Sequence, residues 1–294
     1  MKFEANGIIP AMLTPMDQNG EINKKVLREL TNYLIENGVH GLFAISSTGE
    51  CYGLSFEEKK RLLKIVLEEA AGRVPVYAGT GLITTRDTIK MTQLAEEMGV
   101  DAVSVITPMF VRPNNKELYN HFKSVADSVD IPVMLYNNPA RTGVNIDSDL
   151  LKELSEIDNI VGIKDSSGDM TLIGEFIRKT PTDFNVLIGK DTLILSGLLY
   201  GANGAIASTA NLAPKLLVDI YEQFMKGDLN KARKAQFDLF PLRMSYSLGS
   251  FPVIIKDGLK LLGIDAGNTL GPVESLGDQE REELKSILKD INVI

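Results

Sequence analysis

The sequence predicts a (β/α)8 barrel followed by a small helical domain, and two patterns support this fold class. Eight short apolar segments alternate with amphipathic helical segments, and their starts recur at intervals of roughly 20 to 35 residues, the size of one strand-helix unit. After Gly227 the strand pattern stops and only helical patterns follow. We therefore expect residues 1–226 to form the barrel and residues 227–294 the helical domain. A doubly wound open sheet is the alternative, but it leaves two strands unexplained.

The expected strands are short apolar runs bounded by turn residues. Continuous apolar runs, rather than alternating ones, are typical of strands buried on both faces of a parallel sheet. In chain order, the expected strands are residues 7–13, 41–46, 74–79, 102–106, 132–136, 160–164, 185–189 and 204–207.

The expected helices have an apolar stripe at helical spacing and recognisable ends. In the first, Val26, Leu30 and Leu34 fall on one face, and Gly38 follows as a stop. Ser55 and Glu58 have the spacing of a capping box, which opens the second helix. The expected helices of the barrel are residues 23–37, 55–72, 85–98, 115–128, 147–154, 170–178, 193–200 and 213–225, and those of the tail are residues 228–246, 251–262 and 277–290.

The composition excludes several classes of protein. The chain has 294 residues, of which 44% are hydrophobic and 24% charged, and its formal net charge is -8, which argues against nucleic acid or an anionic membrane as partner. It has no apolar run long enough to span a membrane and no basic-then-apolar leader, so we expect a cytoplasmic protein. One cysteine, Cys51, and two histidines, His40 and His121, leave few ligands for a metal, so we expect none.

Lys164 is the first candidate for chemistry, because it ends the sixth expected strand and is followed by a Ser/Gly/Asp turn. An ammonium held at the end of a buried strand is partly desolvated, which lowers its pKa and frees the neutral amine as a nucleophile towards a carbonyl carbon. A strand-end lysine that simply reaches solvent is the more common case for such a segment. The residues at the other strand ends favour the catalytic interpretation.

Active sites of (β/α)8 barrels lie where the carboxyl ends of the strands converge. Residues 46–50 follow the second strand with hydroxyls and a glycine, and such a turn can bind a carboxylate, although it is also a common structural turn. Tyr136 ends the fifth strand, next to the sixth, where its phenol can touch Lys164 and relay a proton. Arg141 follows and can hold a second carboxylate with two hydrogen bonds, or can be a surface charge.

Four motifs carry a resemblance to a known family. The motifs are Ser47-Thr48-Gly49-Glu50, Tyr136-Asn137-Asn138-Pro139, Gly162-Ile163-Lys164-Asp165-Ser166 and Gly201-Ala202-Asn203-Gly204-Ala205-Ile206. With these motifs the chain resembles the dihydrodipicolinate synthase and N-acetylneuraminate lyase family of class I aldolases, in the family's order and over essentially the whole chain.

The resemblance implies catalytic roles for Lys164, Tyr136 and Ser47. Lys164 is expected to form a Schiff base with the ketone of pyruvate or of another 2-keto acid. Ser47 and Thr48 are expected to hold the pyruvate carboxylate, and Tyr136 to move protons during imine formation and at the aldehyde oxygen.

The resemblance also implies a pocket lined by the backbone carbonyls of Gly189 and Ile206. It implies that neither a metal nor an organic cofactor is needed. The expected partners are small molecules, namely pyruvate or a 2-keto acid and an aldehyde, and the expected assembly is a homotetramer built as a dimer of dimers.

Some residues depart from the family's pattern. Phe110 occupies the place where synthases and sialic acid lyases carry a relay tyrosine from the neighbouring subunit, and a phenyl ring cannot pass a proton. Phe56, Lys59 and Ile83 replace the residues that bind lysine in feedback-inhibited synthases, so no lysine inhibition is expected. Residues 250–256 also differ from the synthase tail, whereas Arg141 matches the synthase residue for the carboxylate of aspartate semialdehyde.

These observations leave three hypotheses. Arg141 and the Ser47-Thr48 pair favour a dihydrodipicolinate-synthase-like condensation of pyruvate with aspartate 4-semialdehyde. Phe110 and the altered tail favour an aldolase or dehydratase that acts on a 2-keto-3-deoxy sugar acid. A non-catalytic sensor that binds a keto acid is the alternative from another class, and the retention of Lys164 argues against it, since a binder gains little from a desolvated amine.

Overall fold

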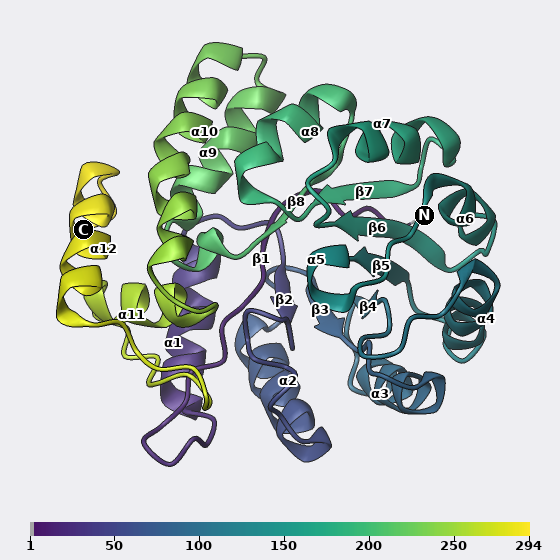
Figure 1. Ribbon diagram of the computed structural model, residues 1–294, viewed down its shortest axis with the longest axis horizontal. Helices are drawn as coiled ribbons and strands as arrows, with labels where there is room; N and C mark the ends of the chain where they lie inside the picture. The colour runs from purple at the N-terminus through teal and green to yellow at the C-terminus, as the bar shows by residue number, and fades with distance from the viewer. Residues whose placement is uncertain (1–2) are drawn as a thin grey trace. The chain divides into compact units, whose positions relative to one another are not determined.

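The strands of the computed structural model, which describes residues 3–294, run parallel and form one sheet (Figure 1). In residues 3–294 they are β1 (Gly7–Pro10), β2 (Leu42–Ala44), β3 (Val76–Gly79), β4 (Ala102–Ile106), β5 (Val133–Asn137), β6 (Ile160–Asp165), β7 (Asn185–Ile188) and β8 (Gly204–Ala207). Their order in the sheet is β1-β8-β7-β6-β5-β4-β3-β2. Nearly all their residues are buried, as the continuous apolar runs predict.

The two strands at the ends of this order also pair with each other. Ala11, just after β1, forms a parallel bridge with Phe43 of β2, and the Met12 amide donates to the Phe43 carbonyl at 2.9 Å. The His40 amide likewise donates to the Ile8 carbonyl at 2.8 Å. A cyclic order of eight parallel strands is that of a (β/α)8 barrel, so the predicted fold class is confirmed.

Helices alternate with these strands along the chain. The helices up to β8 are α1 (Lys24–Glu36), α2 (Phe56–Ala70), α3 (Thr85–Glu97), α4 (Asn115–Ala126), α5 (Pro139–Thr142), α6 (Ser148–Leu154), α7 (Met170–Lys179) and α8 (Ile194–Tyr200). After β8 come α9 (Pro214–Met225), α10 (Leu229–Met244), α11 (Val253–Leu261) and α12 (Asp278–Asp290).

Local signals placed most of these boundaries within a few residues of the predicted ones. The capping box is present: the Ser55 hydroxyl accepts from the Glu58 amide, and the Glu58 carboxylate accepts from the Ser55 amide. Such a cap contributes about 1 kcal/mol to helix stability. Helix α5 was not predicted, because one turn that starts at Pro139 is too short to show a periodic pattern.

The chain forms two compact units. The central unit contains Tyr77–Ile206 and residues 3–7, and the terminal unit contains Ile8–Val76 and Ala207–Ile294. In the terminal unit α9 and α10 pack side by side, one on each side of the predicted boundary at residues 226 and 227 (Figure 1). That boundary between barrel and helical domain stays a prediction.

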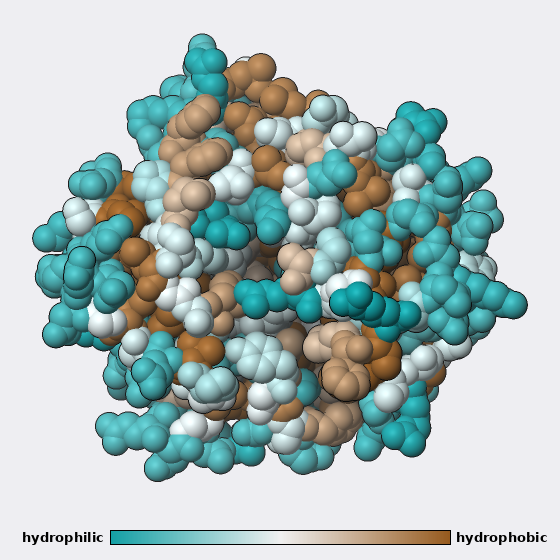
Figure 2. Space-filling view, in the orientation of Figure 1, coloured by the Kyte–Doolittle hydropathy of each residue, from teal (hydrophilic) through white to brown (hydrophobic). Residues whose placement is uncertain are grey.

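Helix α10 presents apolar side chains on its outer side. Phe237 and Phe240 stack with ring centroids 5.4 Å apart, and Phe237, Met244 and Leu229 are exposed. Figure 2 shows a band of brown, apolar surface over this helix. Apolar patches of this kind mark surfaces that contact other molecules.

His121 of α4 is buried without a second hydrogen-bond partner. Its Nδ1 lies 2.9 Å from the Thr85 hydroxyl, and within residues 3–294 no partner is found for its Nε2. Burial lowers the pKa of His121 from 6.5 to about 4. The neutral imidazole is therefore the form that the fold accommodates.

We expect His121 to destabilise the fold in acid. Its folded pKa lies below its unfolded pKa, so the unfolded chain binds the proton first, and stability falls as the pH drops from 6.5 towards 4 and then levels off. The loss is up to about 3 kcal/mol. This loss of stability is measured by urea unfolding of the wild type and of His121→Gln at several pH values. The titration of His40 is common to both proteins, so it cancels in the comparison. Parallel stability curves for the two proteins would contradict this role.

Candidate active site

Lys164 and Tyr136 lie side by side at the carboxyl ends of β6 and β5. The two residues are paired in the register of these strands. The Lys164 Nζ lies 4.2 Å from the centroid of the Tyr136 ring. Only 5% of Lys164 and 6% of Tyr136 is exposed. The structure thus brings together the amine and the phenol that the sequence predicts as neighbours, and it holds the amine away from bulk water.

A hydrogen-bond network fixes the ends of these two strands. The Asn137 amide group donates to Asp165 Oδ1 at 2.8 Å and to Asn145 Oδ1 at 2.9 Å. The Ser167 hydroxyl donates to Asp165 Oδ2 at 2.5 Å. Burial raises the pKa of the Asp165 carboxyl, and these hydrogen bonds oppose that shift. Because Asn137 and Asp165 follow Tyr136 and Lys164 directly, their bond holds the two functional side chains in register.

Tyr136 also contacts Asn138, two residues further along the chain. The Asn138 side-chain amide donates to the phenol oxygen at 2.8 Å. Asn138 is itself buried, with 9% of its surface exposed. The sequence places Asn138 in the motif that contains Tyr136 but assigns it no role, although an amide close after a strand-end tyrosine is a visible signal.

Arg141 lies in the single turn of α5, directly after the Tyr136 strand. Pro139 opens this turn and Gly143, with a φ of 70°, ends it. The Arg141 amide donates to the Asn138 carbonyl at 3.0 Å, and the residue is exposed. Arg141 therefore lies at the same end of the strands as Lys164, at the protein surface.

Gly189 and Ile206 differ in their surroundings. The Gly189 amide donates to the Asp165 carbonyl at 2.6 Å, and its own carbonyl accepts from the Ser166 hydroxyl at 3.3 Å. A Cβ at residue 189 would overlap the Ser166 hydroxyl and lie 2.8 Å from the Asp165 carbonyl oxygen, so only glycine fits. Ile206 is buried within β8.

The turn that contains Ser47 and Thr48 belongs to the terminal unit and is tied down on both sides. The Ser46 hydroxyl donates to the Met12 carbonyl at 3.0 Å and accepts from the Gly49 amide at 3.1 Å. The Thr14 hydroxyl donates to the Gly49 carbonyl at 2.7 Å. Thr48 is buried and Ser47 half-buried. The turn is therefore pre-organised, as a binding site for an anion requires.

Backbone strain marks the two ends of this turn. Ile45 has a φ of 55° and Glu50 a φ of 56°, in the left-handed region that a β-branched residue such as isoleucine rarely adopts. Such conformations cost of order 1–3 kcal/mol each and cluster at functional sites. A Cβ at Gly49 would lie 2.7 Å from the Thr14 hydroxyl and 2.8 Å from the Met12 carbonyl oxygen, so the turn also requires glycine.

Comparison with known proteins identifies the family. The model of the dihydrodipicolinate synthetase family matches residues 4–291. A 4-hydroxy-tetrahydrodipicolinate synthase of Methanopyrus kandleri is 36% identical over 100% of this chain and 99% of its own length. One of Methanospirillum hungatei is 39% identical over 96% of this chain and 98% of its own. The chain belongs to the dihydrodipicolinate synthetase family.

Solved structures agree with this membership. A dihydrodipicolinate synthase of Bacillus anthracis superposes with a TM-score of 0.95 at 37% identity, covering 98% of this chain and 99% of the other. A prophage protein of the same family from E. coli K12, solved in complex with pyruvate, has a TM-score of 0.95 at 33% identity and the same coverage. The resemblance predicted from the four motifs is confirmed, and the chain is a pyruvate-dependent class I aldolase of this family.

Phe110, which the sequence predicts to occupy the place of a relay tyrosine, is the most exposed large apolar residue described. It follows β4 with a φ of 74°, and 93% of its surface is exposed. The left-handed backbone of Phe110 costs free energy, and the exposed phenyl ring buries too little surface within its own chain to offset that cost. The Phe110 side chain is therefore available for contact with another molecule.

A buried ion pair, Glu50 with Lys256, was not predicted. Lys256 Nζ lies 2.7 Å from Glu50 Oε1 and donates to the Asn268 carbonyl at 2.5 Å. Glu50 Oε2 accepts from the Leu270 amide at 2.7 Å. Burial lowers the pKa of Lys256, and the Glu50 carboxylate opposes this shift. The pair joins the Ser47 turn to α11 and to the segment after it within the terminal unit.

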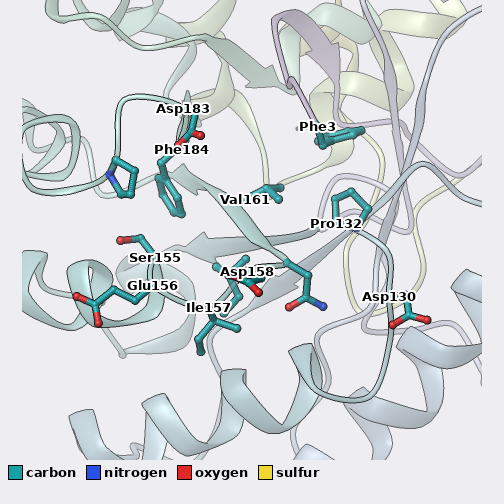
Figure 3. A pocket seen from close by; sticks show the side chains of 13 residues that line it. Phe3, Asp130, Pro132, Ser155, Glu156, Ile157, Asp158, Val161, Asp183 and Phe184 are labelled. Atoms are coloured by element: carbon teal, nitrogen blue, oxygen red, sulfur yellow. The ribbon is translucent and has the colours of Figure 1, made fainter. Parts of the chain in front are cut away.

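A separate cavity of ≈ 340 Å³ lies in the central unit at the amino ends of β5 to β7 (Figure 3). Phe3, Pro132, Val161 and Phe184 contribute apolar surface to it, and Asp158 is among the acidic residues at its wall. Val161 lies at the start of β6 and Lys164 near its end, so this cavity is at the opposite end of the strands from the candidate nucleophile. We therefore place the candidate site at Lys164.

In the part of the chain that the structure describes, no group of three or more His, Cys, Asp and Glu side chains is arranged to hold a metal ion. No helix among residues 3–294 combines the length and the apolar character needed to cross a membrane.

Proposed function

We propose that this chain condenses pyruvate with aspartate 4-semialdehyde through a Schiff base on Lys164. The observation that carries the proposal is the burial of the Lys164 amine against the Tyr136 ring at the carboxyl end of β6. Full-length relatives named 4-hydroxy-tetrahydrodipicolinate synthase support the choice of reaction.

In the proposed mechanism the Lys164 amine attacks the ketone carbon of pyruvate. The carbon–nitrogen bond forms and the ketone oxygen leaves as water, giving an iminium that withdraws electrons from the neighbouring methyl group. Loss of a methyl proton gives an enamine, whose carbon attacks the aldehyde carbon of the second substrate. The Tyr136 phenol gives its proton to the aldehyde oxygen as the new carbon–carbon bond forms. Attack of water or of a substrate amine on the imine carbon then releases Lys164.

Carboxylate binding gives the other proposed residues their roles. We propose that Ser47 and Thr48 bind the pyruvate carboxylate, with Ser47 also acting in the proton transfers. The pre-organised turn that holds them supports this role. We propose that the exposed Arg141 binds the carboxylate of aspartate semialdehyde, and that Gly189 and Ile206 line the pocket with backbone carbonyls.

A second candidate reaction is the cleavage or dehydration of a 2-keto-3-deoxy sugar acid. Phe110 favours it, because the phenyl ring lacks the hydroxyl of the relay tyrosine in synthases. A polyhydroxylated substrate brings its own hydroxyl groups, which can replace a missing protein donor.

Arg141→Leu separates the two candidates. If Arg141 grips a carboxylate, kcat/KM for aspartate semialdehyde should fall by roughly 10- to 100-fold, since a charge-assisted hydrogen bond contributes about 1.5–3 kcal/mol. Consumption of pyruvate by wild type is measured with aspartate semialdehyde and with a panel of other aldehydes, and 2-keto-3-deoxy sugar acids are tested for cleavage. Arg178→Leu, on the exposed face of α7, is the matched control. Faster turnover of the sugar acids would support the second candidate instead.

We further propose that the chain works in the cytoplasm as a homotetramer, a dimer of dimers. The exposed apolar side chains of α10 and the outward Phe110 support association with other copies, because such surfaces are costly to leave in water. Sedimentation equilibrium measures the assembly, and a monomer at micromolar concentration would contradict it.

A further inference from the structure

The Asn138 side chain donates a hydrogen bond to the Tyr136 phenol, and the Asn138 backbone is itself held in place. Its carbonyl accepts from the Arg141 and Thr142 amides, both at 3.0 Å, and from the Thr142 hydroxyl at 3.2 Å. Pro139 follows and restricts the backbone of the residue before it. With its backbone held in this way, Asn138 has its side-chain amide fixed against the phenol oxygen at 2.8 Å.

The direction of this hydrogen bond decides what the phenol can do. An amide N–H can only donate, so the phenol oxygen is the acceptor and its own hydrogen points away from Asn138. A donor to a phenol oxygen also stabilises the phenolate that forms when the proton leaves. Tyr33 shows the opposite arrangement, because its hydroxyl donates to the Leu212 carbonyl, and burial raises the pKa of Tyr33 to about 12.

We propose that Asn138 is a positioning residue for proton transfer, which anchors the Tyr136 oxygen and directs its proton towards the substrate on Lys164. This inference rests on the proposed function, in which Tyr136 moves protons. Asn138 acts through Tyr136 and needs no contact with the substrate.

Three variants of Asn138 test the proposal. Asn138→Leu keeps the size and removes the donor, Asn138→Asp keeps the shape but leaves only acceptors, and Asn138→Gln keeps a donor. For the first we expect turnover to fall by roughly 10- to 100-fold, the equivalent of one well-placed hydrogen bond, with little change in the KM for pyruvate. We expect a larger loss for Asn138→Asp, because an ionised carboxylate accepts the phenol proton. Asn138→Gln should recover part of the rate.

The pH profile separates positioning from a structural role. Without the Asn138 donor, the Tyr136 phenol should lose its proton only at a higher pH. The part of the curve of turnover against pH that follows the ionisation of Tyr136 should therefore shift upward by at least half a pH unit in Asn138→Leu. Asn6→Leu is the matched control, since Asn6 is exposed before β1, at the amino ends of the strands, and its side-chain amide donates to Glu4 and not to Tyr136. Its turnover and profile should match the wild type.

The outcomes that overturn the proposal are distinct from failure of the proposed function. A wild-type rate and profile in Asn138→Leu, or a raised KM for pyruvate with an unmoved profile, overturns it. If Asn138→Leu does not fold, the isosteric Asn138→Asp supplies the same comparison. Absence of a borohydride-trapped pyruvate on Lys164 in the wild type would instead overturn the proposed function.

Discussion

Lys164→Ala is expected to reduce turnover by at least about 10⁴-fold, the scale seen when a covalent nucleophile is removed. Wild type treated with pyruvate and borohydride should gain one reduced pyruvate on Lys164, because hydride reduces the imine to a stable amine. The variant should gain none. Intact-mass measurement followed by peptide mapping shows the presence and the position of the label.

The control for this experiment is a second lysine at a strand end. Lys190 follows Gly189 directly after β7, and Lys190→Ala should keep both turnover and labelling of Lys164. A pyruvate label on Lys190, or turnover by Lys164→Ala at the wild-type rate, would falsify the assignment. If the wild type binds pyruvate but borohydride never traps it on Lys164, the hypothesis of a non-catalytic keto-acid sensor would be favoured.

Loss of either partner of the buried Glu50–Lys256 pair is expected to cost about 3–5 kcal/mol of unfolding free energy, because the remaining charge is left buried and uncompensated. The two variants are Lys256→Met and Glu50→Gln. The double variant should recover much of the stability, since apolar and neutral groups replace both charges at once. Urea unfolding of the four proteins gives the coupling free energy directly.

The same pair should also affect substrate binding. Glu50 closes the turn that contains Ser47 and Thr48, so the single variants should bind pyruvate more weakly even where they remain folded. Lys285→Met removes one side of the exposed pair with Glu282 and should change stability by less than about 1 kcal/mol. Equal, small losses of unfolding free energy in all these variants would contradict the stabilising role of the Glu50–Lys256 pair, as would a coupling free energy of zero between residues 50 and 256.

The amino-acid sequence by itself determined the fold class and the central pair of the site. Apolar runs and helical stripes repeat at regular intervals, and both are local patterns, so strands such as β4 and β8 were predicted to the residue. In parallel strands that are neighbours, residues at equal distance from the carboxyl end lie side by side. That rule alone brought Tyr136 of β5 next to Lys164 of β6.

Only the tertiary structure decided which polar side chains meet inside the molecule. Glu50 and Lys256 belong to segments far apart in the chain, and no local pattern pairs them. Asn138 is close to Tyr136 in the chain, but its bond depends on the turn of α5 and on the conformation of its backbone. The physical reason is that local preferences act along the chain, whereas the burial of a charge or a hydrogen-bond donor depends on everything that packs around it.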